Sequence, residues 1–168
     1  MTSEIHVSTM RLNKFMLRLL LVTVVFLGGC VTPPRPIPPE LQYVAPNGQV
    51  GSVATLVGSQ EKGTQNDSIA YVLAVDGKLV MTGTQGWSTP LPIQPGLRNI
   101  TVAFQGGGFN TQVDLQLQAL AGHKYQIQFS TDVRLFGANT YCDFWIIDIA
   151  TKKPVTGIGC GGIVNPPY

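Results

Sequence analysis

The sequence between residues 50 and 164 predicts a small all-β domain. Apolar and polar residues alternate along several short segments, which is the periodicity of a half-buried strand. Glycine, proline, asparagine and aspartate, the residues typical of turns, separate these segments. No stretch of this region repeats its apolar residues at helical spacing. Many short strands joined by such turns are typical of a β-sandwich or a small barrel.

Three segments show the clearest alternation. In residues 112–119 every second residue is apolar, from Val113 to Ala119, and those between are polar. The same pattern places Tyr125, Ile127 and Phe129 on one face of residues 124–130, and Ile100, Val102 and Phe104 on one face of residues 99–104. Each segment is therefore expected to bury one face and expose the other.

Further strands are expected at residues 52–58 and 69–75. The second of these leads through Asp76-Gly77, a strong signal for a two-residue hairpin, into residues 78–81.

Residues 141–149 are the most apolar segment and are expected to form the central strand, with Trp145 in the core. The chain then returns along residues 155–158, for a total of seven or eight strands. We therefore predict a small two-sheet antiparallel sandwich, immunoglobulin-like or transthyretin-like, with a small barrel as the alternative.

The first 29 residues have the layout of a secretory signal. Basic residues come first, an apolar run of nine residues occupies positions 19–27, and Gly28 and Gly29 precede Cys30. The run is too short to cross a hydrocarbon core of ~30 Å as a helix. Met1 and Met10 both remain possible starts.

The sequence Leu27-Gly28-Gly29-Cys30 resembles the lipobox of bacterial lipoproteins. The resemblance implies cleavage by signal peptidase II between Gly29 and Cys30, and a lipid on the sulfur of Cys30. A membrane is then the partner, reached through this anchor. Val31 follows in place of aspartate, which favours the periplasmic face of the outer membrane.

Prolines concentrate in residues 30–49, where they disfavour both helix and sheet. We expect these residues to form an extended tether between the acylated cysteine and a sandwich domain at residues 50–164. Residues 165–168 are expected to form a tail.

The charge of the processed chain argues against nucleic acid as a partner. Removing residues 1–29 takes three of the 11 basic and one of the 9 acidic residues, so residues 30–168 carry no net charge. No cofactor is expected.

Cys142 and Cys160 are the two cysteines that remain after Cys30. A pair of cysteines in an exported domain predicts a disulfide, and the two flank a predicted hairpin. The alternative is a redox or metal site, although neither a CxxC motif nor metal-ligand spacing is present, and no metal is expected.

Three short stretches resemble the PEGA-type repeat of bacterial envelope proteins. They are Val75-Asp76-Gly77-Lys78, the run from Thr89 to Gly96 that contains Thr-Pro-Leu and Pro-Gly, and Ile100-Thr101-Val102. The long spacer at residues 83–87 and the Arg98-Asn99 pair depart from that pattern. The resemblance implies a β-sandwich without known chemistry.

No catalytic residue is predicted. His123 and Ser88 lie in turns without a recognisable partner or nucleophile motif. Asp143 and Asp148 are five residues apart on one strand and should face opposite sides. Residues 106–108, three glycines, lack the helix that a phosphate loop requires and predict a hairpin tip.

Trp87 and Phe109 are the possible binding residues, because aromatic side chains in loops often serve recognition. The sequence predicts a lipid-anchored, non-enzymatic structural or interaction module of the bacterial envelope, whose partner is an envelope protein or a glycan. The alternative is a module that binds glycan or peptidoglycan, or that inhibits a hydrolase.

Overall fold

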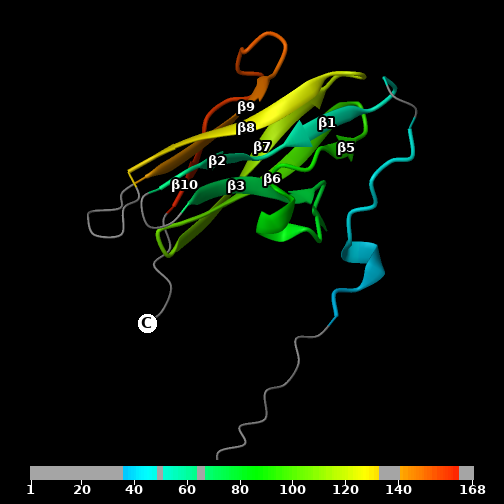
Figure 1. Cartoon of the computed structure of the whole chain (residues 1–168). Helices are drawn as coiled ribbons and strands as arrows, with labels where there is room; N and C mark the ends of the chain where they lie inside the picture. Colours follow the sequence, from blue (N-terminus) through cyan, green and yellow to red (C-terminus); the bar gives the residue numbers. More distant parts are fainter. Residues whose placement is uncertain (1–35, 49–50, 64–66, 133–140, 163–168) are drawn as a thin grey trace, which may run out of the picture. The chain divides into compact units, whose positions relative to one another are not determined.

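A computed structural model of the chain describes residues 36–48, 51–63, 67–132 and 141–162. Within these residues ten strands, where the sequence predicts seven or eight, and two short 3-10 helices belong to a compact unit that begins at Ile37. The strands make two layers (Figure 1). The described residues contain no helix long and apolar enough to span a bilayer.

One layer, here called the β8 sheet, has the strand order β10-β9-β8-β1-β5. Its strands are β1 (Ala54–Val57), β5 (Leu91–Ile93), β8 (Lys124–Thr131), β9 (Cys142–Asp148) and β10 (Gly159–Gly161). Neighbours pair antiparallel except β1 and β8, which run parallel. The predicted sandwich is therefore confirmed, with one parallel pair that the sequence did not indicate.

The other layer, the β6 sheet, has the order β2-β3-β6-β7, and β4 pairs with β3. Its strands are β2 (Ser59–Glu61), β3 (Ser68–Val75), β4 (Lys78–Leu79), β6 (Gly96–Gly106) and β7 (Phe109–Ala119). The helices η1 (Pro39–Leu41) and η2 (Gly83–Gly86) lie outside the sheets.

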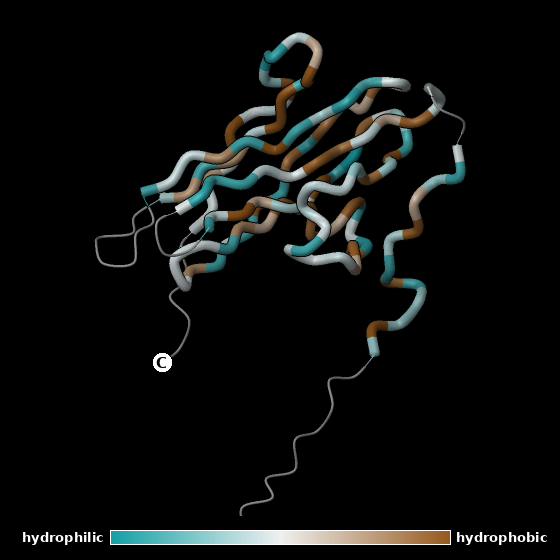
Figure 2. The backbone as a smooth tube through the Cα atoms, in the orientation of Figure 1, coloured by the Kyte–Doolittle hydropathy of each residue, from teal (hydrophilic) through white to brown (hydrophobic). Residues whose placement is uncertain are grey.

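The core lies between the two sheets and consists of the apolar set of each alternating strand. Along β7 and β8 buried and exposed positions alternate as the sequence predicts, which Figure 2 shows as alternating hydropathy along the tube. Three aromatic rings meet in this core: the ring of Phe104 lies edge-on to those of Phe129 and Phe144, at centroid distances of 5.3 and 6.4 Å.

Two hairpins have the turns that the sequence predicts. Asp76 and Gly77 have φ angles of 51° and 77°, and Gly107 and Gly108 have 57° and 83°. Positive φ at both central residues matches the right-handed twist of the strands that such a turn joins. The glycine-rich segment at 106–108 is thus the tip of the β6–β7 hairpin.

Tyr125 fixes the point where the chain passes from the β6 sheet to the β8 sheet. Its ring is buried, and its hydroxyl accepts a hydrogen bond of 3.0 Å from the backbone N–H of Leu120. The bond joins the start of β8 to the turn that follows β7, as in the tyrosine corner of immunoglobulin-like sandwiches.

The chain also changes sheet at Gly58, between β1 and β2. The β1–β8 ladder ends at the pair Val57–Gln126, and the next strand, β2, belongs to the β6 sheet. The N–H of Gly58 donates a hydrogen bond of 2.6 Å to the carbonyl of Trp87. A Cβ at this position would collide with the carbonyl oxygen of Ala70, so only glycine fits the crossing.

Three expectations about single elements are wrong. The segment 141–149 is not central, because β9 lies between β8 and the short edge strand β10. The return of the chain is β10 at Gly159–Gly161, whereas residues 155–158 form no strand. Trp145 lies on the outer face of β9. The inner positions of this strand are those of Cys142, Phe144, Ile146 and Asp148.

The predicted domain start at residue 50 is also too late. Tyr43 donates its backbone N–H to the carbonyl of Leu79 and its hydroxyl to that of Pro92, both at 2.8 Å. Its ring packs against the core. Proline content indicates an extended backbone but says nothing of docking, and the apolar ring of Tyr43 makes docking favourable.

Candidate functional site

Trp87 is held rigidly beside the crossing at Gly58. It caps the C-terminal end of η2, and its N–H donates to the carbonyl of Thr84 at 3.4 Å. Its own carbonyl accepts the hydrogen bond from Gly58. The indole side chain is partly exposed. The loop residue that the sequence singles out for recognition therefore sits on fixed backbone.

Trp87 lines a groove of about 310 Å³ whose other residues come from two strands. Ser59, Gln60 and Glu61 of β2 form one wall, and Gln126, Gln128 and Phe129 of β8 form the other. The groove exists because β1 leaves the β8 sheet after Val57, so that β2 and the later half of β8 diverge.

The lining is equally polar and apolar, and Glu61 provides its one charge. Three carboxamides, from Gln60, Gln126 and Gln128, each offer two N–H donors and one acceptor oxygen. The carboxamide of Gln60 donates to Asp67 at 2.7 Å. Such a surface suits a neutral ligand that is rich in hydrogen-bonding groups.

Ser59 carries the one buried side-chain oxygen that makes no hydrogen bond within the described part of the chain. Native proteins leave few such groups unpaired, because an unpaired buried hydroxyl costs ~1–3 kcal/mol. Ser59 lines the groove, but its hydroxyl oxygen is itself buried, so a group in the groove does not reach it in this conformation.

Trp145 extends this surface across the next strand. It is the direct cross-strand partner of Gln128, and both residues occupy outer positions of their strands. Gln128 therefore has one tryptophan across the groove and a second beside it in the sheet. The sequence could not reveal this arrangement, because β9 is apolar on both faces and its inner face cannot be identified from its pattern.

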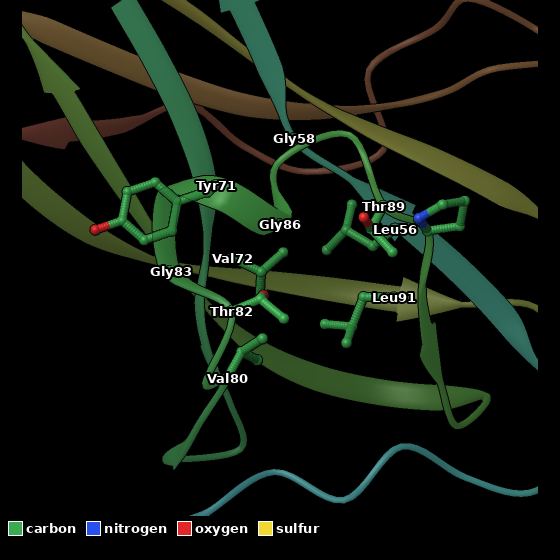
Figure 3. Close-up of a pocket in the computed structure, with 11 residues that line it drawn as sticks. Leu56, Gly58, Tyr71, Val72, Val80, Thr82, Gly83, Gly86, Thr89 and Leu91 are labelled. Carbon is green, nitrogen blue, oxygen red and sulfur yellow. The ribbon is translucent and has the colours of Figure 1, made fainter.

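A separate small cavity of about 50 Å³ lies beneath η2 (Figure 3). Leu56, Val72, Val80 and Leu91 line it together with Thr82, and Figure 3 shows these side chains directed toward a common space. Its volume suits at most a few water molecules. It is a packing gap under the helix that carries Trp87.

His123 and Asp148 form a pair that the sequence did not predict. The Nδ1 atom of His123 lies 2.6 Å from Oδ2 of Asp148, and Oδ1 accepts the N–H groups of Ala150 and Thr151 at 2.9 and 3.0 Å. The bond from His123, followed by that from Thr151, lowers the pKa of Asp148, against the opposing effect of desolvation. The ionised carboxylate accepts only, so Nδ1 carries the proton.

This pair has the geometry of the base and orienting acid of a catalytic triad, but not its nucleophile. The surrounding groove is lined by Gly122, His123, Lys124, Asp148, Ile149 and Ala150, with no hydroxyl or thiol among them. Asp148 instead ties the β9 turn to the start of β8. The β8–β9 register is the signal that could have revealed this pair. It places Asp148 opposite Tyr125, and Tyr125 is two residues after His123.

We expect this pair to make the domain sensitive to acid. A carboxyl whose pKa is lower in the folded state adds stability that is complete above its unfolded pKa of ~3.9 and is lost as pH falls through the folded value. Asp148→Asn should therefore reduce stability at pH 7 and flatten its decline below pH ~4. Urea unfolding at pH 7, 4 and 3 measures both effects. Asp76, whose pKa Arg98 also holds down, remains as a second acid-sensitive group.

The predicted disulfide between Cys142 and Cys160 is wrong: both thiols are free. In the β9–β10 register Cys142 opposes Gly161 and Cys160 opposes Asp143, so the two side chains point to opposite faces. Cys142 faces the core, and burial raises the pKa of its thiol to about 12. Cys160 faces outward, and its hydrogen bond with Asp143 raises the pKa of its thiol.

The other candidate residues do not line the groove. Phe109 is the first residue of β7, directly after the hairpin tip, and is partly buried, whereas Ser88 is exposed. Asp143 and Asp148 face opposite sides of β9, as predicted. Within the described residues no three His, Cys, Asp or Glu side chains are close enough to bind a metal ion.

Gly29 and Cys30, the predicted cleavage and lipidation residues, lie outside the described residues. Comparisons with protein-family models, with curated proteins and with solved structures each gave no match.

Proposed function

We propose that the chain is an exported lipoprotein, anchored at the periplasmic face of the outer membrane through an acylated Cys30, and that its sandwich is a non-enzymatic structural or interaction module of the envelope. The observation that carries the proposal is the sequence Leu27-Gly28-Gly29-Cys30 directly after a nine-residue apolar run. A lipid adds ~0.8 kcal/mol of membrane binding per buried methylene, so two or more acyl chains hold the protein stably.

The folded unit supports a module that works close to its anchor. Since residues 37–48 belong to the domain, the proposed tether shortens from residues 30–49 to at most residues 30–36. A chain spans at most ~3.6 Å per residue, which limits the reach of this tether to ~25 Å. Partners would then be molecules near the membrane surface.

Replacement of the anchoring cysteine tests the proposal. We expect the native protein to incorporate labelled palmitate and to sediment with outer membranes, whereas Cys30→Ala should lose the label and leave the membrane fraction. Cys160→Ala is the matched control, because it removes an exposed thiol of the domain and should change neither result.

Mass analysis of the purified protein gives a second readout. The proposal requires an amino terminus at Cys30 with added acyl mass. An uncut leader, or a bare terminus elsewhere, would contradict it. Crosslinking in cells with the native protein and with Cys30→Ala then tests tethering itself, since identical neighbours without the lipid would exclude it.

A further inference from the structure

We infer that the groove beside Trp87 binds a neutral oligosaccharide, with Trp87 and Trp145 as stacking surfaces and Gln126 and Gln128 as hydrogen-bonding residues between them. These four residues are called the tryptophan face. They lie on the outer side of the β8 sheet and its rim, so a ligand reaches them without any opening of the sandwich.

The residue types match the chemistry of a sugar ring. A pyranose has an apolar C–H face, which packs against a flat indole, and a rim of hydroxyl groups that donate and accept hydrogen bonds. An indole provides large apolar area at a small entropic cost. A carboxamide can donate to one hydroxyl and accept from its neighbour, which a charged group cannot do.

The charges near the groove disfavour other ligand classes. No lysine or arginine lines it, so phosphates and nucleic acids lack the cations that they require. Glu61, its one charged residue, repels anions further. A long apolar peptide segment would need a largely apolar lining, and here Trp87 and Phe129 are the two apolar residues among the seven.

The volume of the groove sets the size of the ligand. The groove, at about 310 Å³, is at the lower end of the ~300–1,000 Å³ of ligand sites, which suits one or two sugar units. Trp145 lies on the neighbouring strand β9 and would stack against the next sugar unit.

The identification of the natural sugar rests on the proposed function. At the periplasmic face of the outer membrane, the neighbouring glycan is the peptidoglycan strand, a polymer of N-acetylated hexosamines. Their acetamido groups can pair with glutamine carboxamides. The groove itself makes no use of the lipid, so its binding can be tested separately from the anchor.

Titration of the full-length protein in detergent with chitotetraose tests the inference, with maltotetraose as the probe for an unrelated glucan. We expect saturable binding of chitotetraose by calorimetry and a change in tryptophan fluorescence. Trp87→Ala should weaken the affinity at least tenfold and Gln128→Ala several-fold. Tyr141→Ala, which removes an exposed aromatic ring outside the tryptophan face, should leave it unchanged.

Gln126→Ala separates binding from folding. It truncates a partly exposed side chain that lines the groove, so stability should change little, whereas affinity should fall several-fold. If Trp87→Ala does not fold, Trp87→Phe and Gln126→Ala provide the same test. Preferential binding of maltotetraose would refute peptidoglycan as the source while retaining the sugar site.

Two results would overturn the inference. One is the absence of binding to either oligosaccharide, and the other is binding that Trp87→Ala and Gln126→Ala leave intact. Cys30→Ala should bind chitotetraose as the native protein does. A failure of the sugar site therefore leaves the anchor untouched, and a failure of the anchor leaves the sugar site testable.

Discussion

Gly58→Ala should destabilise the domain by about 3 kcal/mol or more, at the upper end of the cost of overpacking. The added Cβ would collide with the carbonyl oxygen of Ala70 and would lie 2.9 Å from that of Trp87. Both obstacles are backbone atoms, which cannot move aside as the end of a flexible side chain can. Relief requires a shift of β3 or of the loop that holds Trp87, and either shift weakens the hydrogen bond from Gly58.

Equilibrium unfolding in urea measures this change. Gly157→Ala is the matched control, because the space around its Cβ is empty and its φ angle is not left-handed. It should shift stability by no more than ~0.5 kcal/mol. Equal effects of the two substitutions would show that the crossing at Gly58 is not sterically closed.

Phe104→Ala should cost about 3–5 kcal/mol, which is the usual effect of removing a buried phenylalanine ring. The ring is 1% exposed and lies between those of Phe129 and Phe144, which belong to the opposite sheet. Its loss leaves a cavity between the two layers. Small domains have a total stability of ~5–15 kcal/mol, so the variant should be close to unfolding at 37 °C.

Thermal and urea unfolding of the variant test this expectation. Leu97→Ala removes an apolar side chain from the same strand at a position that is 61% exposed, and it should change stability by less than ~0.5 kcal/mol. A Phe104→Ala protein as stable as this control would contradict the packing described here.

Local patterns of the sequence predicted the strands and their turns well. Alternation along β7 and β8 identifies their inner faces, because each strand has one apolar and one polar face. The Asp76-Gly77 turn follows from residues that tolerate positive φ. Such features depend on neighbours in the sequence and need no knowledge of the topology.

The errors arose where the outcome depends on distant residues. In β9 both faces are apolar, so nothing local shows that Trp145 faces outward or that Asp148 faces inward to meet His123. The prediction of a disulfide was wrong because Cys142 and Cys160 are one residue out of register, which directs the two thiols to opposite faces of the sheet. The groove combines residues 59–61, 87 and 126–129, which only the strand order brings together.

One uninterrupted segment, β1 followed by β2, couples the unfolding of the two layers. Residues 54–61 contribute backbone bonds first to β5 and β8 and then to β3. Unfolding of either sheet removes hydrogen-bond partners from the same eight residues, so we expect the two sheets to unfold together on heating or in denaturant.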